Sequence, residues 1–517
     1  MGSMRPACIF AVLLFVAAAL PAQWSPATGQ WGKTLADDVR VMSYNVQDCL
    51  CSTNTKQAGA NNWTALARIV AAMRPDVLVL QECADNSGNG TGTTMDTVAN
   101  MTTVINLFLH GGTDTFTAGS PPVGAYVQLY APTFDLPYIF VSTVHDNYNR
   151  NIILSRWPFA DLNGDTQSQL SNIPNVTAHL YAGGGNGGIR GFMFAEINLP
   201  STYAGDLIVG NAHLKAGGTA ADHTQRVNAA RNVAYYIDHL LNGAGTGTPD
   251  PFAKIADAPA AAFLPNPNTA VVLGGDWNED EVTNGTVGPA AWLTEALTPD
   301  GVGGTDGTDR NRTDMALDGA QDFFTASTST GFSAKYDYIA FQDSVAARRR
   351  GFVFNTASLG GASIPAALIG YPGTISSMTT TASDHRPVIV DFILPRALAC
   401  NTAAIDLGFA KLGGNMLFPR FAACGSTAVG APVTLALSDA APSALIYIGV
   451  GATTGFLNIA GGTILPTPLS VLGPFQSDAL GAFSITIPNG AGSAVVQWAI
   501  VDPGATFSLA FSNGLSF

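Results

Sequence analysis

Six short apolar runs in this chain each end in polar residues, and this pattern constrains the fold more than any other feature of the sequence. Runs of this kind are typical of buried β-strands. A carboxylate, amide or imidazole at the end of a buried strand loses its hydration unless it meets a partner or a metal ion. We therefore expect the strand ends to converge on one site. They read Tyr44-Asn45, Gln81-Glu82, Asn211-Ala212-His213, Gly275-Asp276-Trp277-Asn278, Tyr336-Asp337-Tyr338 and Ser383-Asp384-His385.

Helical periodicity is confined to a few segments between these strands. An amphipathic helix is predicted over residues 62–73 and a longer one over 224–241. Residues 84–135 are rich in Gly, Thr and Asn, and we expect mostly an elaborated loop there. Few helices among many strands indicate an α/β sandwich, with two packed β-sheets and helices outside. The expected strands span residues 39–45, 76–82, 151–154, 192–199, 207–213, 270–276, 336–341 and 387–394.

Composition changes near Pro395. From residue 399 to 517 charged residues become rare and strand-like alternation dominates, for example over 443–450, 483–487 and 495–501. Asn489-Gly490 is a strong turn signal between two of these runs. We therefore expect one unit over residues 39–395, followed by a separate β-sandwich-like module over 399–517.

The N-terminus has the pattern of a secretion signal. Arg5 precedes an unbroken apolar run from Ala7 to Leu20, and Ala22 precedes a plausible cleavage point. The run is shorter than the roughly 20 residues of a membrane span, and no basic stop-transfer cluster follows. Residues 1–22 are predicted to be a signal peptide and 23–38 a loose lead-in, so we expect a secreted or cell-surface protein.

The net charge bears on which partners the protein can bind, and the cysteines bear on which disulfides it can form. The formal net charge of −14 argues against a stable, salt-driven complex with nucleic acid, but it is compatible with a hydrolase that grips a phosphate through a metal ion. Export permits disulfides. We expect Cys400 to pair with Cys424, and Cys83 to pair with Cys49 or Cys51.

Seven stretches, taken together and in this order, resemble the endonuclease/exonuclease/phosphatase family, which includes deoxyribonuclease I, abasic-site endonucleases, neutral sphingomyelinases and inositol-phosphate phosphatases. The resemblance spans about residues 39–394, and it implies a four-layered α/β sandwich. GDWN and SDH, with LQE upstream, are the specific part of the pattern. The stretches are SYNVQ, LVLQE, NIILSRWP, GNAHLKA, VVLGGDWNED, YDYIAF and SDHRPVIVDF.

The resemblance implies a metal site. Glu82 resembles the principal metal ligand, with Asn45 beside it, and Asp384 resembles a further ligand or the partner that orients an imidazole. Oxygen ligands of this kind suit Mg²⁺, with Mn²⁺ or Ca²⁺ as alternatives.

The resemblance also implies catalytic roles. His385 resembles the histidine at the scissile phosphate, Asp276 orients or deprotonates the attacking water, and Asn278 binds a phosphate oxygen. His213 matches a histidine of the deoxyribonuclease- and sphingomyelinase-like members. We expect Asp337 to pair with His213, which would then protonate the leaving oxygen.

Other charged residues are secondary candidates. Arg150, Asn151 and Lys215 are predicted to contact the substrate phosphate. Asp222 and Arg226 are expected to form an i,i+4 pair on the long helix. The segment 161–165 imitates half of a calcium loop and is expected to be a turn, and the run Arg348-Arg349-Arg350 is expected at the surface.

The function that follows is a secreted, metal-dependent phosphodiesterase, with DNA or RNA as the favoured substrate. The first alternative is a phospholipid phosphodiesterase resembling sphingomyelinases, or a phosphatase. The second is a catalytically inactive secreted binding protein. We expect a monomer whose C-terminal module contacts the cell surface or the export machinery.

Overall fold

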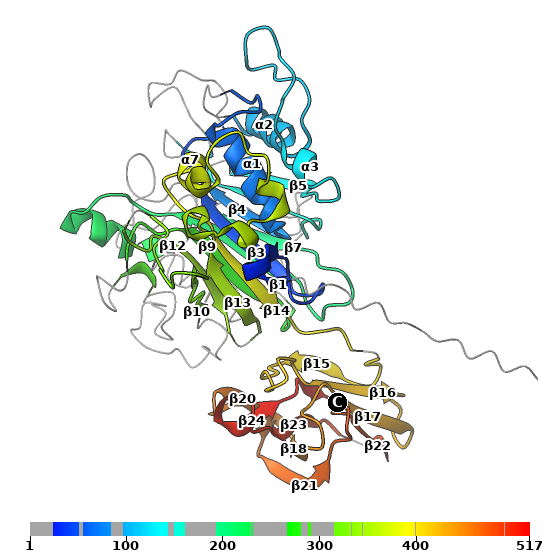
Figure 1. Cartoon of the computed structure of the whole chain (residues 1–517). Helices are drawn as coiled ribbons and strands as arrows, with labels where there is room; N and C mark the ends of the chain where they lie inside the picture. The colour runs from blue at the N-terminus through cyan, green and yellow to red at the C-terminus, as the bar shows by residue number, and fades with distance from the viewer. Residues whose placement is uncertain are drawn as a thin grey trace, which may run out of the picture.

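Two large β-sheets pack face to face in this protein, and a second strand-rich unit follows them in the chain (Figure 1). Within the described residues, no helix combines the length and apolarity needed to cross a membrane. The predicted signal peptide, the segment 161–165 and residues 231–241 of the predicted long helix lie outside the described residues. The computed structural model describes residues 24–50, 55–83, 97–142, 149–160, 193–230, 266–280, 288–290 and 315–517, apart from positions 228, 332, 344, 399 and 491.

The larger sheet has seven strands, and β3 and β4 run parallel at its centre. The crossover between them is α1 (Asn62–Met73), whose N-terminus is capped by the Asn61 side chain. In spatial order the strands are β11 (Gln321–Asp322), β13 (Ala347–Val353), β14 (Val388–Ile393), β3 (Val39–Asn45), β4 (Val77–Gln81), β6 (Ile152–Ser155) and β5 (Tyr138–Val141).

The smaller sheet has five strands, with β8 and β9 parallel and the other pairs antiparallel. Its register places His213, Asp276 and Asp337 at matching positions of three adjacent strands. In spatial order the strands are β10 (Met315–Leu317), β12 (Asp337–Gln342), β9 (Ala270–Asp276), β8 (Leu207–His213) and β7 (Met193–Ile197).

Successive side chains along each strand point to opposite faces of the sheet, so the core is divided into layers. Val41 and Val79 of the larger sheet join Val209 and Val272 of the smaller one in a single buried cluster between the sheets. The opposite face of the larger sheet packs against helices α1, α2 (Val98–His110), α3 (Val127–Tyr130) and α7 (Met378–Ala382). Residues 220–227 and 229–230 are also helical. The predicted four-layered α/β sandwich is confirmed.

Helix α2 corrects the expectation of a loop over residues 84–135. Met101, Val104, Ile105 and Phe108 are buried at helical spacing, and this apolar stripe outweighs the Thr and Asn residues around it. The Thr97 side chain caps the first turn by accepting a hydrogen bond from the backbone of Asn100.

In the basic run of β13, Arg348 is exposed, as expected, and Arg349 and Arg350 are half-buried; all three side chains have partners in the sandwich. Arg349 Nε lies 2.7 Å from Asp38 Oδ2, and Arg350 Nε lies 3.6 Å from Asp391 Oδ2. Arg348 donates to the Asp318 carbonyl. These partners hold strand β13 in place, so we assign the run a structural role.

The short elements of the sandwich lie outside these sheets. A two-stranded sheet pairs β1 with β2 near the start of the described chain. The elements are β1 (Trp24–Ser25), β2 (Gln30–Trp31) and the 3₁₀ turns η1 (Pro26–Thr28), η3 (Thr356–Ser358), η4 (Gly361–Ser363), η5 (Ala366–Leu368) and η6 (Ile375–Ser377).

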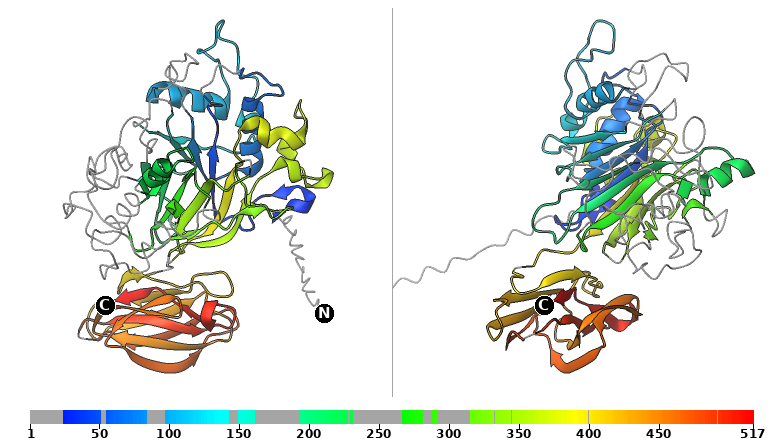
Figure 2. Two further views of the ribbon diagram at one scale, coloured as in Figure 1. Left: turned by 90° about the vertical axis from the view of Figure 1, so that its left-hand side faces the viewer. Right: turned by 180° about the vertical axis from the view of Figure 1, so that it is seen from behind.

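Residues 400–517, called the C-terminal unit below, form antiparallel sheets that lie beneath the sandwich in Figure 2. Phe421, Leu435, Ile446 and Trp498 belong to its buried core. Its strands are β15 (Ile405–Gly408), β16 (Arg420–Gly425), β17 (Pro432–Ser438), β18 (Leu445–Gly451), β19 (Thr453–Ile459), β20 (Gly462–Thr467), β21 (Ser470–Gln476), β22 (Phe483–Pro488), β23 (Val495–Val501), β24 (Leu509–Phe511) and β25 (Gly514–Ser516), with the turn η7 (Thr506–Ser508).

The chain changes sheets at the Asn489-Gly490 turn, because β22 pairs with β17 whereas β23 pairs with β18. The Cys400–Cys424 disulfide is confirmed. Cys83 is a free, buried thiol, so the predicted bridge from Cys83 is wrong.

Candidate functional site

The polar strand ends meet at one edge of the sandwich. Asn45 and Gln81 are register neighbours at the ends of β3 and β4, and Glu82 follows directly. In the facing sheet, His213 and Asp276 are register neighbours at the ends of β8 and β9. Asn45 Nδ2 donates to Asp276 Oδ2 at 2.9 Å, and this hydrogen bond joins the two sheets.

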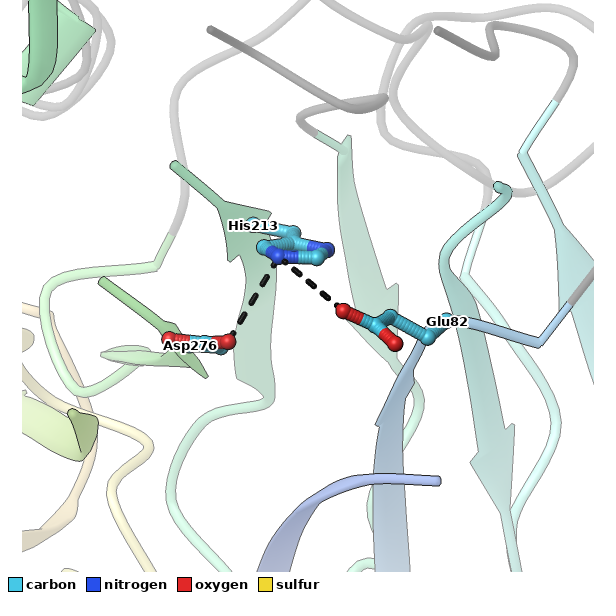
Figure 3. Close-up of side chains that lie close together, drawn as sticks. All are labelled: Glu82, His213 and Asp276. Atoms are coloured by element: carbon cyan, nitrogen blue, oxygen red, sulfur yellow. Dashed lines mark ion pairs between the residues drawn. The ribbon is translucent and has the colours of Figure 1, made fainter. Parts of the chain in front are cut away.

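One side-chain cluster at this edge contains Glu82, His213 and Asp276 (Figure 3). His213 Nε2 lies 3.6 Å from Glu82 Oε1 and 3.5 Å from Asp276 Oδ2. The His213 side chain is fully buried, whereas that of Glu82 is 20% exposed, so the cluster is open to solvent on the Glu82 side. One ligand atom from each residue lies within 4.8 Å of the others, which is a spacing that could hold a metal ion.

A second cluster shares Asp276 and adds Asp337 and His385. His385 Nδ1 lies 2.7 Å from Asp337 Oδ2, and His385 Nε2 lies 3.7 Å from Asp276 Oδ2. The predicted pairing of Asp337 with His213 is therefore wrong. Strand β9 lies between β12 and β8, so Asp337 and His213 are two strands apart, or about 9–10 Å across the sheet.

Burial and neighbouring charges shift two pKa values in opposite directions. Burial raises the pKa of Asp276 to about 7; the carboxylates of Asp337 and Glu82 add to the rise, and His385 and Asn45 oppose it. Burial alone would lower the pKa of His385, but the charges of Asp337 and Asp276 raise it to about 11. At neutral pH the His385 imidazole is therefore protonated, while the Asp276 carboxyl is close to its midpoint.

The backbone around Asp276 requires specific residue types. A Cβ at Gly275 would lie 1.9 Å from the Ala212 carbonyl oxygen, so only glycine lets β8 and β9 approach this closely. Asn278 adopts a left-handed conformation with φ of 55°, which asparagine tolerates better than most residues. Its backbone N–H donates to Asp276 Oδ1 at 2.9 Å, and its side-chain amide donates to the Leu214 carbonyl at 3.2 Å.

The predicted metal ligands Asn45 and Asp384 lie at different depths. Asn45 is fully buried, and its Oδ1 already accepts a hydrogen bond from the backbone of Gln47. The Asp384 side chain is about one-third exposed, and its Oδ1 lies 4.0 Å from His385 Nε2. The orienting partner of the His385 imidazole is therefore Asp337, and Asp384 lies outside both clusters.

The predicted phosphate contacts have protein partners. Arg150 is buried and donates to the Ser142 carbonyl at 2.8 Å, and Asn151 is fully buried. Lys215 Nζ donates to the Ala216 carbonyl and lies 3.6 Å from Asp222 Oδ1. Of these three side chains, that of Lys215 is the most exposed, at 28%, whereas Arg150 and Asn151 are buried.

Sequence reasoning missed Glu279, a buried carboxylate that follows the GDWN stretch. It binds Arg226 and His223, so the expected i,i+4 pair of Arg226 with Asp222 is wrong. Arg226 also donates to the carbonyls of Lys215 and Gly217, at 2.9 and 2.7 Å. The salt bridge thus ties the loop after His213 to the turn after Asp276. The signal was present in the sequence, because the first acid of the NED stretch, Glu279, needs a cationic partner once it is buried.

A model of the Endonuclease/Exonuclease/phosphatase family matches residues 42–399 of this chain. No curated protein sequence matches it.

Among solved structures, an endonuclease/exonuclease/phosphatase from Beutenbergia cavernae DSM 12333 is 16% identical, with 92% of this chain and 99% of that chain covered and a TM-score of 0.36. Truncated Caenorhabditis elegans TDP2 is 14% identical over 69% of this chain and 98% of that chain, with a TM-score of 0.34. The human Nocturnin catalytic domain with bound sulfate anion is 11% identical over 70% of this chain and 96% of that chain, with a TM-score of 0.35.

Proposed function

This chain belongs to the endonuclease/exonuclease/phosphatase family and is a hydrolase of the phosphodiesterase and phosphatase type; from this premise we propose that it is a secreted, divalent-metal-dependent nuclease. The observation that carries the proposal is the sharing of Asp276 between two clusters, one formed with Glu82 and His213 and the other with Asp337 and His385. This arrangement combines candidate metal ligands with an oriented imidazolium at the solvent-accessible edge of the sandwich.

The side chains at this edge fit a divalent cation. Burial raises the pKa of Asp276, and the carboxylates of Asp337 and Glu82 lie close enough to add to this rise, so three acidic side chains meet in a buried setting. Glu82 and Asp276, with His213, would hold the ion. Carboxylate oxygens suit Mg²⁺, and an imidazole nitrogen in the set also suits Mn²⁺. When bound, the cation would polarise a phosphoryl oxygen and stabilise charge on the leaving oxygen.

The protein's own groups supply proton transfer and orientation. Asp337 holds His385 through Nδ1, so Nε2 is left to donate a hydrogen bond to a non-bridging oxygen of the scissile phosphate. The Asp276 carboxyl is shared by the two clusters, so it is placed to accept a hydrogen bond from the attacking water and orient it. Asn278 and Lys215 lie on adjoining turns, where they can contact the phosphate.

The choice of nucleic acid as substrate rests on the surroundings of the clusters. The described side chains at the rim include Gln47, Lys215 and Asp384, which are polar and favour a substrate in water over one drawn from a bilayer. The net charge of −14 disfavours a long-lived complex with nucleic acid, and this is compatible with an enzyme that releases its product. We propose residues 39–395 as the hydrolase and 399–517 as a module that contacts the cell surface or export machinery.

A substrate panel tests the function. The wild type is assayed with Mg²⁺, Mn²⁺ or Ca²⁺ on bis(p-nitrophenyl) phosphate, plasmid DNA, RNA and sphingomyelin vesicles. We expect metal-dependent cleavage of the diester and the nucleic acids, lost in Glu82→Ala and His385→Ala. Asp478→Asn, in the C-terminal unit, is the matched control. Vesicle hydrolysis without DNA or RNA cleavage would instead support the phospholipid alternative, and equal activity in all variants would remove the assigned site.

Secretion has a separate test. If residues 1–22 are a signal peptide, N-terminal sequencing of the exported protein will begin at Gln23. Retention of Met1 in the exported protein would contradict this proposal.

A further inference from the structure

A half-buried aromatic ring, that of Tyr336, lies beside the His385 imidazole, and the chemistry proposed above does not use it. Tyr336 immediately precedes β12 and Asp337. Its ring centroid is 6.3 Å from that of His385, and the two planes are inclined at 47°. Because the Nε2 of His385 is the atom that faces the reacting phosphate in our proposal, a group beside this imidazole lies next to the substrate.

The backbone beneath Tyr336 holds the ring in place. A Cβ at Gly331 would lie 2.7 Å from Tyr336 Cδ2, so the ring packs directly on the backbone of residue 331. Thr330 Oγ1 accepts hydrogen bonds from the N–H groups of Tyr336 and Asp337, both at 2.9 Å. The Thr330 carbonyl accepts from the N–H of Arg386 at 2.7 Å, which links this turn to the segment carrying His385.

We propose that the Tyr336 ring is a platform on which a nucleobase adjacent to the scissile phosphate stacks. The inference rests on the proposed nuclease function and adds the contact that selects the substrate. A tyrosine ring offers a large, rigid apolar face at low conformational cost. Every base has a π-face, so such a platform tolerates any sequence but distinguishes a nucleotide from a phosphodiester that lacks an aromatic ring.

The contact can also be explained as simple support for His385, and the two explanations differ in their kinetics. Loss of a stacking contact weakens binding only of substrates that carry a base. Loss of support displaces the imidazole, which lowers kcat for every phosphodiester and alters the pH profile. A pair of substrates that differ only in the base therefore separates the explanations.

The experiment compares a thymidine trinucleotide with the same deoxyribose-phosphate backbone carrying abasic tetrahydrofuran residues. In the wild type we expect the thymidine substrate to have the lower KM. Tyr336→Leu should raise that KM by roughly tenfold and leave the KM of the abasic substrate unchanged. Tyr336→Phe keeps the ring and should leave both values unchanged. The pH profile of kcat should be the same in all three proteins.

Three results would overturn the platform. The first is that Tyr336→Leu raises KM equally for both substrates. The second is that it lowers kcat and shifts the pH profile. The third is that it changes neither KM nor kcat. Hydrolysis of bis(p-nitrophenyl) phosphate, but of neither trinucleotide, by the wild type would remove the nuclease function and the platform together. Hydrolysis of both trinucleotides with equal KM would remove the platform alone.

Discussion

The sandwich and the C-terminal unit are both built on buried strands, but they use buried polar side chains differently. At the edge of the sandwich, Asp276 and Asp337 interact with other ionisable side chains, and like charges remain close together. In the C-terminal unit, the half-buried Lys411 instead donates from Nζ to the backbone carbonyls of Ala460, Thr506 and Leu509. Polar groups that bond the backbone stabilise a fold, whereas like charges held together in a buried site shift pKa values and mark a candidate functional site.

Charge content follows the same division. Asp406 accepts hydrogen bonds from Asn268 and Asn513, and Arg420 pairs with Asp439, so these charges serve structure. Among the described residues, both groups that could hold a metal ion lie in the sandwich. The charged residues of the C-terminal unit are Asp406, Lys411, Arg420, Asp439, Asp478 and Asp502.

The largest expected effect tests whether charge at the sandwich edge is functional. Asp337→Asn keeps the shape of the side chain but removes the charge that holds His385 protonated. We expect kcat for bis(p-nitrophenyl) phosphate to fall by roughly 10²–10⁴-fold. Asp439→Asn, which removes a charge from the C-terminal unit, should leave kcat unchanged. Similar losses of kcat in the two variants would contradict the assignment of a functional role to the sandwich charges and a structural role to those of the C-terminal unit.

A smaller effect is expected in the C-terminal unit. Cys400 and Cys424 close a loop with a sequence separation of 24, and the double change to serine should destabilise this unit by about 3 kcal/mol. Hydrogen exchange at β16 and β17 measures the loss. Hydrolytic activity should persist under native conditions, because the disulfide is absent from the site. Loss of activity at unchanged exchange in the sandwich would show that the two units are functionally coupled.

The smallest effect concerns Glu196, buried on β7. Burial, reinforced by Asp206, raises its pKa from 4.5 to about 8. The folded state therefore keeps a proton that the unfolded state releases, so this group reduces stability as the pH rises from about 4.5 towards 8. Glu196→Gln should stabilise the sandwich at pH 8 by on the order of 1 kcal/mol and have little effect at pH 4.5. Thermal unfolding at the two pH values measures this, and an equal effect at both would contradict it.

The sequence was sufficient to predict the strands that carry the site. Val39–Asn45, Leu207–His213 and Ala270–Asp276 are strands with the predicted bounds, because continuous apolar runs of this length fit a sheet covered on both faces. Helix α2 was predictable in principle, since Met101, Val104, Ile105 and Phe108 have helical spacing. The Gly- and Thr-rich flanks concealed it.

The partner of each imidazole was not predictable, because it depends on sheet order. From the sequence we expected Asp337 to pair with His213. In the fold, Asp276 occupies the register position between Asp337 and His213, and His385 reaches Asp337 from the segment that precedes β14 of the facing sheet. Which strands are neighbours is a long-range property, whereas apolar runs are local.

The hydrogen bond from Asn45 to Asp276 crosses from one sheet to the other, and this has a kinetic consequence. A refolding chain can recover turnover only after both sheets have formed and associated, however early each one forms. An ion held jointly by Glu82 and Asp276 would cross-link the sheets and raise the temperature at which they separate. Turnover is therefore a reporter of sheet association as well as a measure of catalysis.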